Sequence, residues 1–169
     1  AFGKKKKNAI LALNNGAKQG GFYHNTGEGG LSPYHLQGGD VVWNIGTGYF
    51  SCRTDEGKFN YEEFVKRATL ENVKMIEIKF SQGAKPGHGG ILPKEKVTDE
   101  IAAIRLVSKG KDILSPPTHS AFSTPLELIE FVKLLRKGSG GKPIGIKICI
   151  GNKSEFISIC KAMVETKTY

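Results

Sequence analysis

Apolar residues recur with a helical period in five segments of the chain, and most of these segments carry a start signal. Ile10, Leu13 and Ala17 share one face of the first segment. Thr124 and Glu127 form a capping box at the start of another, with a proline at its first helical position. The pattern predicts helices over residues 8–18, from 60 to about 70, from Thr98 through Val107, over 124–137, and after Asn152.

Short apolar runs lie between these segments and read as strands. They cover residues 22–24, 41–45, 73–80, 112–114 and 144–150. Strands that alternate with helices indicate a parallel sheet. Because loops rich in glycine, proline or polar residues follow the strands, we expect a (β/α)8 TIM-barrel type, with a doubly wound sheet as the alternative. A closed barrel needs about 250 residues. We therefore expect residues 1–169 to be a single domain of about five strand–helix units, a partial barrel that lacks the first strand and the last units.

The segment 81–93, Ser-Gln-Gly-Ala-Lys-Pro-Gly-His-Gly-Gly-Ile-Leu-Pro, follows the strand predicted over 73–80. It holds four glycines and two prolines in thirteen residues, so it is neither strand nor helix. Loops at the carboxyl end of a parallel strand are where α/β proteins bind ligands. Gln82, Lys85 and His88 provide an amide, an ammonium and an imidazole, which suit an anion or a polar heterocycle.

Composition narrows the function classes. The net charge is +9, but apart from the lysine run 4–7 the basic residues are scattered, and no nucleic-acid-binding motif occurs. No apolar run approaches the roughly 20 residues that span a bilayer, so no membrane partner is expected. The three cysteines form no metal-binding spacing, which favours free thiols in a reducing cytoplasm and no metal site. We expect Cys149, in an apolar run, to be buried.

Five stretches together resemble the FMN-binding synthase domain of the glutamate synthase family, and in particular its stand-alone, glutamate-synthase-like members. They occur in the family's order. The stretches are Asn-Thr-Gly-Glu-Gly-Gly at 25–30, Gln-Gly-Ala-Lys-Pro-Gly at 82–87, Gly-Gly at 89–90 with Leu-Pro at 92–93, Lys-Val at 96–97, and Ser-Pro-Pro at 115–117 with His119. Ile-Lys at 146–147 also fits. The resemblance covers residues 25–150, with weaker similarity over the first helix.

The resemblance implies an FMN-dependent oxidoreductase on a (β/α)8 barrel. In this family 2-oxoglutarate and ammonia form 2-iminoglutarate, which reduced flavin converts to L-glutamate by hydride transfer. The implied partners are a small anionic substrate, an ammonia source and an electron-donor protein. The loops that bind the FMN phosphate, and the family's iron–sulfur cysteines, have no counterpart here, so an iron–sulfur cluster is expected only outside this segment. The segment alone is expected to be inactive.

Four residues are expected to bind the flavin. Reduced flavin is stabilised by a cation and by polar groups at its pyrimidine edge. Lys147, between Ile146 and Ile148, suits the cation role, although a lysine extending to the end of the sheet is the alternative. Asn25 and Gln82 suit the ring edge, or serve as loop amides. Ser115 either contributes a hydroxyl near the isoalloxazine or ends its strand.

Three residues are expected to bind the substrate. A dicarboxylate needs cationic partners, and Lys85 and Arg105 match family positions that contact substrate. Arg105 also fits a solvated helix face. Glu28 matches a position near the substrate, where it would hold an ammonium or imine group or orient Lys85; an acidic turn residue is the alternative. No residue is assigned as catalytic acid or base.

One departure from the family pattern leaves the identity of the substrate undecided. Ile91 stands where the large enzymes carry glutamine, an amide expected to contact substrate. The alternative functions are therefore an FMN oxidoreductase that acts on another 2-oxo acid or amine, and a non-catalytic barrel fragment that binds an anion or a partner domain. The sequence does not identify the electron donor, the ammonia source or the oligomeric state.

Overall fold

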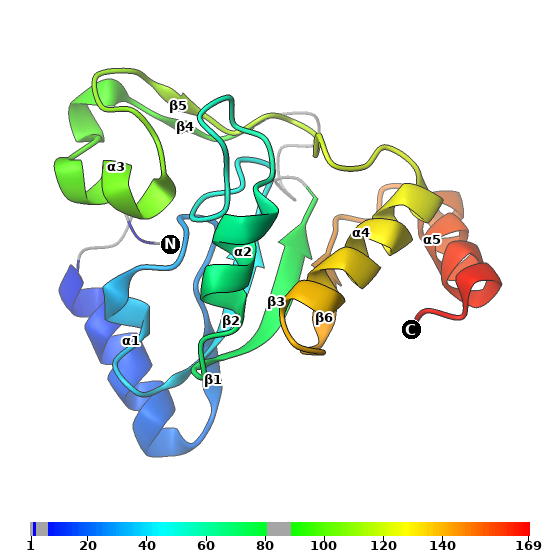
Figure 1. Cartoon of the computed structure of the whole chain (residues 1–169), viewed down its shortest axis with the longest axis horizontal. Coiled ribbons are helices and arrows are strands. Elements are labelled where there is room, and N and C mark those ends of the chain that lie inside the picture. The colour runs from blue at the N-terminus through cyan, green and yellow to red at the C-terminus, as the bar shows by residue number, and fades with distance from the viewer. Residues whose placement is uncertain (1, 3–6, 81–88) are drawn as a thin grey trace.

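The computed structural model describes residue 2, residues 7–80 and residues 89–169. Its centre is a four-stranded sheet in the order β1, β2, β3, β6, and every neighbouring pair is parallel. Because the strands run in the same direction, their carboxyl ends lie along one edge (Figure 1). The strands are β1 (Tyr23–Asn25), β2 (Asp40–Ile45), β3 (Val73–Lys79) and β6 (Ile144–Lys147).

The helices begin where the sequence predicted. They are α1 (Lys7–Gly20), α2 (Tyr61–Ala68), α4 (Pro125–Gly138) and α5 (Lys153–Thr166). The Asn60 side chain accepts a hydrogen bond from the backbone N–H of Glu63 at 3.0 Å at the start of α2. At the start of α4, Thr124 and Glu127 form both bonds of the expected capping box. These local contacts satisfy N–H groups that a helix leaves free in its first turn.

The helices cover one face of the sheet. Trp43 of β2 stacks on Phe64 of α2, with ring centroids 5.7 Å apart, and His24 of β1 contacts Asn14 of α1 at 3.0 Å. Successive strand residues point to opposite faces. The strand residues adjacent to His24 and Trp43, among them Asn44, therefore point away from the helices. A doubly wound sheet would have helices on both faces. The described part is an α/β fold compatible with the wall of a partial (β/α)8 barrel.

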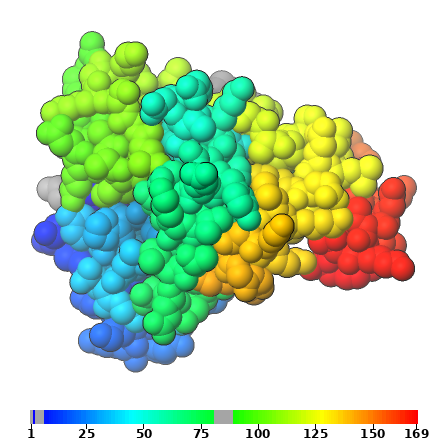
Figure 2. Space-filling view, viewed as in Figure 1, coloured from blue at the N-terminus to red at the C-terminus, as the bar shows by residue number. Residues whose placement is uncertain are grey.

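Residues 91–114 form a small lobe beside the sheet. It contains η2 (Lys94–Lys96), α3 (Asp99–Arg105) and a two-stranded antiparallel sheet of β4 (Ile91–Leu92) and β5 (Ile113–Leu114). The strand predicted over 112–114 therefore exists but does not join the parallel sheet. Its buried Ile113 packs in a separate hydrophobic cluster with Leu92 and Ile101. Figure 2 shows this lobe above α1 and away from α5.

Two further predictions, both for the region around β6, are wrong. The strand predicted over 144–150 ends at Lys147, and Cys149, expected to be buried, is exposed. Lys147 pairs with Lys79, the last residue of β3, and β6 is at the edge of the described sheet, so Cys149 has no strand partner on either side within the described residues. Among the described residues, no helix combines the length and the apolar character that crossing a bilayer requires.

Candidate active site at the carboxyl edge of the sheet

Polar side chains gather on the face of the sheet that the helices leave open, near its carboxyl edge. The strand register pairs Asn44 of β2 with Glu77 of β3, and Lys79 of β3 with Lys147 of β6. Within β3, Glu77 and Lys79 alternate with Ile76 and Ile78, which are fully buried on the helix side. Charged and amide groups from separate parts of the chain are thus brought together by parallel pairing.

An amide–carboxylate cluster lies at the centre of this face. Oε1 of Glu77 accepts hydrogen bonds from Nδ2 of Asn25 at 3.0 Å and from Nδ2 of Asn44 at 2.5 Å. The Oδ1 atom of Asn25 accepts the backbone N–H of Gly27 at 2.8 Å, which shapes the glycine-rich turn after β1. Oδ1 of Asn44 is buried and has no hydrogen-bond partner within the described parts of the chain. The predicted flavin contact Asn25 is thus held by two partners.

An ion pair connects the same strand to the same turn. Lys79 Nζ lies 2.9 Å from Glu28 Oε2, and both side chains are mostly buried. Glu28 is also close enough to Arg105 to favour the charged guanidinium, whose pKa burial lowers. Glu28 is thus paired with Lys79 and lies near enough to Arg105 for an electrostatic attraction.

Arg105 is buried, so the solvated-helix interpretation does not apply. Its Nη2 donates to the carbonyl oxygen of Phe2 at 3.0 Å, and its guanidinium lies over the Phe50 ring, 4.7 Å from the centroid. Its Nε is buried without a hydrogen-bond partner among the described residues. A buried guanidinium with free donor capacity favours an anion, because an unpaired buried charge is costly.

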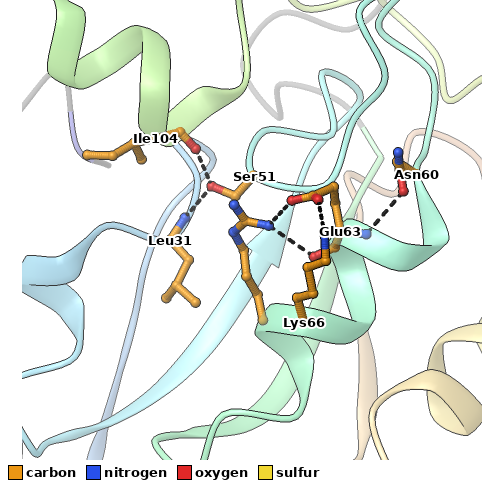
Figure 3. A network of polar contacts seen from close by, with 7 residues as sticks. Leu31, Ser51, Asn60, Glu63, Lys66 and Ile104 are labelled. Carbon is orange, nitrogen blue, oxygen red and sulfur yellow. Dashed lines mark hydrogen bonds and ion pairs between the residues drawn. The ribbon is translucent and has the colours of Figure 1, made fainter.

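The loop after β2 connects the glycine-rich turn to the helix that carries Arg105. The Ser51 hydroxyl donates to the carbonyl oxygen of Ile104 at 2.6 Å and accepts the backbone N–H of Leu31 at 2.9 Å (Figure 3). A Cβ atom at Gly30 would lie 2.4 Å from the Ser51 Oγ, and Gly30 has a φ of +87°, so only glycine fits there. Figure 3 also shows the neighbouring α2 network, in which Glu63 pairs with a lysine and an arginine.

His119 joins the segment before α4 to the carboxyl end of β3. Its Nε2 lies 2.9 Å from the carbonyl oxygen of Lys79, and its Nδ1 lies 2.9 Å from the Tyr49 hydroxyl. The His119 ring also stacks on Phe122 with centroids 4.7 Å apart. Burial lowers the pKa of His119, which favours the neutral ring. This histidine of the Ser-Pro-Pro stretch therefore has a packing role next to the site.

A cavity of about 800 Å³ lies on the helix side of the sheet, beyond His119. Its walls come from the segment before α4, the first turns of α4 and α5, and the residues that follow β6, and they are mostly apolar. Phe80, Leu128 and Ile159 are among the lining residues, and the exposed Cys149 lies at its side. The cavity is therefore separate from the polar cluster around Glu77.

The predicted site residues are brought together only in part. Asn25, Glu28 and Arg105 lie around the amide–carboxylate and ion-pair clusters, and Lys147 lies in register beside Lys79 with an exposed side chain. Ser115 is at the end of β5, where its backbone N–H donates to Gly90 at 2.8 Å; no contact joins it to Glu77 within the described regions. Gln82 and Lys85 lie outside the described residues.

Sequence reasoning missed Asn44, Glu77 and Lys79. A signal for two of them was present in the strand Val-Lys-Met-Ile-Glu-Ile-Lys, where charged residues alternate with buried isoleucines. A carboxylate and an ammonium on alternate positions of a central strand must share one face, and such groups are rarely buried without partners.

Among the described residues, no group of three histidine, cysteine or acidic side chains could hold a metal ion.

Comparison with known proteins identifies the family. The family model described as a conserved region in glutamate synthase matches residues 1–168. A glutamate synthase large subunit-like protein of Bacillus subtilis is 43% identical over 158 residues, which is 92% of this chain and 30% of that protein. An archaeal glutamate synthase [NADPH] of Methanocaldococcus jannaschii is 32% identical over 161 residues, 94% of this chain and 29% of that protein.

An archaeal-type glutamate synthase [NADPH] of Thermotoga maritima is 34% identical over 151 residues, 88% of this chain and 27% of that protein. The chain thus spans less than a third of the length of these curated relatives. The similarity extends over the polar edge of the sheet, the small lobe and the last helix alike. Because the family model matches nearly every residue, the chain belongs to the glutamate synthase family.

Proposed function

We propose that this chain is part of an FMN-dependent oxidoreductase that reduces an imine of 2-oxoglutarate to L-glutamate. The relatives named glutamate synthases support a role in forming glutamate, and the FMN and the imine are what the motif resemblance implies. The observation that carries the proposal is the polar carboxyl edge, where amide, carboxylate and ammonium groups of four parallel strands and the turn after β1 converge on one face. This is the edge at which parallel α/β folds bind ligands. Coenzyme binding, substrate and electron donor are all part of the proposal.

The residues present fit a flavin ring. Lys147 has an exposed side chain on the open face and can donate to the pyrimidine edge as a cation. Asn25 is exposed, and its Nδ2 retains a second hydrogen for a ring acceptor while the first bonds Glu77. Gln82 and Ser115 would complete the ring contacts, as expected from the resemblance. When bound, FMN supplies the hydride that this chemistry requires.

The substrate side of the site follows from charge. A dicarboxylate 2-oxo acid carries two negative charges, and Arg105 and Lys85 would pair with them. Glu28, held by Lys79, would accept a hydrogen bond from the imine or ammonium nitrogen. Pairing with Lys79 offsets the negative charge of Glu28, which would otherwise repel the substrate carboxylates.

The identity of the 2-oxo acid is the second part of the proposal. Ile91, at the position where the large enzymes have an amide, is 66% exposed on β4. An apolar residue there cannot donate a hydrogen bond to a substrate carboxylate. This observation supports a second candidate, an FMN oxidoreductase that reduces the imine of another 2-oxo acid.

The cellular location is also part of the proposal. The free cysteines fit a cytoplasmic location.

The test uses the full-length protein. We expect it to bind FMN, with the visible absorption of a flavoprotein, and we expect 2-oxoglutarate with ammonia to reoxidise the reduced protein under anaerobic conditions. Reoxidation by other 2-oxo acids with ammonia, and none by 2-oxoglutarate, would favour the second candidate. A protein that remains colourless with added FMN would contradict both and indicate a non-catalytic binding module.

A further inference from the structure

The central feature of the open face is that one carboxylate oxygen holds two amides from two other strands. Oε1 of Glu77 accepts from Asn25 at 3.0 Å and from Asn44 at 2.5 Å. We propose that Glu77 is a positioning residue that fixes the orientation of both amides and, through Asn25, the shape of the glycine-rich turn carrying Glu28. The residue itself contacts neither substrate nor cofactor in this proposal.

An amide side chain has no intrinsic preference between its two orientations. The oxygen and nitrogen of asparagine are nearly equal in size, so the hydrogen-bond network decides which atom points where. A carboxylate only accepts, and it therefore directs the NH2 groups of Asn25 and Asn44 toward itself. Their Oδ1 atoms must then point away. A neutral apolar side chain at position 77 would remove this constraint from both residues at once.

The orientation of Asn25 has a consequence along the chain. With its NH2 group on Glu77, its Oδ1 accepts the backbone N–H of Gly27 at 2.8 Å. Gly27 has a φ of +65°, so the turn bends sharply at this point. The next residue, Glu28, is held by Lys79 at 2.9 Å. Two side chains on one face of β3 thus hold the same turn, one through an amide and one through an ion pair.

The strand on the other side of β3 leaves space for this arrangement. The register partner of Glu77 on β6 is Gly145, which has no side chain to compete for the carboxylate. A Cβ atom at Gly145 would lie 2.3 Å from the terminal carbon of Met75, so a larger residue would disturb the open face. Glu77 is therefore free to bond toward β1 and β2.

The first experiment measures positioning without flavin. Amide hydrogen exchange of Gly27 is followed in the flavin-free full-length protein for Glu77→Met and Glu77→Gln. Both amides bond the same oxygen, and glutamine keeps one such oxygen, so Glu77→Gln should retain the protection of Gly27. Glu77→Met should raise its exchange rate about tenfold, as loss of a hydrogen bond predicts. Equal exchange in Glu77→Met and wild type would overturn the proposal.

The second experiment rests on the proposed function and measures FMN affinity. Glu77→Met should weaken it about tenfold to a hundredfold, and Glu77→Gln by no more than about threefold. Glu130→Met, which removes an exposed carboxylate of α4 paired with Lys133, serves as the control and should change nothing. If Glu77→Gln is as impaired as Glu77→Met, the charge of Glu77 matters and positioning is refuted. If the wild type binds no FMN, the proposed function fails while the exchange experiment still decides the role of Glu77.

Discussion

The hydrogen bonds of Tyr49 allow a quantitative prediction for the segment beside the site. Nε2 of His119 faces the carbonyl oxygen of Lys79, which can only accept, so Nε2 carries the proton of the neutral ring. Nδ1 is then an acceptor and takes the Tyr49 hydroxyl proton at 2.9 Å. The same hydroxyl oxygen accepts the backbone N–H of Ala121 at 3.1 Å. Tyr49→Phe removes this hydroxyl and preserves the ring.

The expected loss of stability comes mainly from His119. Its side chain is 93% buried, as its 7% relative exposure shows, so Nδ1 cannot recover a donor from bulk water. An unsatisfied buried acceptor costs about 1–3 kcal/mol. Ala121 is exposed, and water can replace its lost partner. Because phenylalanine fills the same space, no cavity term is added. We therefore expect Tyr49→Phe to destabilise this region by about 1–3 kcal/mol.

Urea unfolding of the full-length protein, combined with amide exchange of residues 119–122, measures this loss. The control is Tyr61→Phe, because the Tyr61 hydroxyl is at the surface of α2 and has no hydrogen-bond partner in the described regions. Its effect should stay within about 0.5 kcal/mol. If Tyr49→Phe unfolds at the same urea concentration as the wild type, with unchanged exchange, the assigned tautomer and its bonding are wrong.

Three further predictions concern pH, capping and substrate. Burial lowers the pKa of His35 to about 4. The free energy of unfolding should therefore be highest above the unfolded pKa of about 6.5 and fall as the pH drops toward 4, by up to about 1.4 kcal/mol per pH unit. His35→Asn should flatten that part of a curve of stability against pH. Thr124→Ala should destabilise by about 1 kcal/mol in thermal unfolding and Thr124→Ser much less, because serine still caps α4. Lys85→Ala should retain FMN and raise KM for the 2-oxo acid; unchanged KM and kcat would contradict the substrate site.

The helices could be predicted because their signals are local. Asn60 caps a helix through a residue three positions away, and Thr124 does the same. Such pairs are visible in the sequence itself. The strand at 73–79 was also predictable, since its apolar residues occur at strand spacing between turn signals. The family resemblance, carried by several motifs in order, was confirmed by the match over residues 1–168.

The remaining features depend on pairing that the sequence does not contain. Glu77 accepts hydrogen bonds from residues 52 and 33 positions away in the chain, so its partners could not be predicted from the residues next to it in the sequence. The strand over 112–114 was placed in the parallel sheet, yet its partner is β4, because a two-residue apolar run carries no information about its neighbour. Cys149 was expected to be buried and is exposed, because the pairing of β6 with β3 ends at Lys147, which the apolar run 144–150 does not reveal. Arg105, between apolar residues, fitted two interpretations; its burial excludes the solvated helix face, and its substrate role stays a prediction.

The measurement that tests the central claim most directly is an FMN titration of full-length variants that alter lysines at opposite ends of the sheet. Lys147 lies at the carboxyl end of β6, whereas Lys74 lies near the start of β3 beside Asp40. If ligand binding takes place at the carboxyl edge, Lys147→Met should weaken FMN binding about tenfold or more, and Lys74→Met should change it by less than about twofold. Equal affinities for Lys147→Met and wild type, or a larger loss with Lys74→Met, would contradict the account.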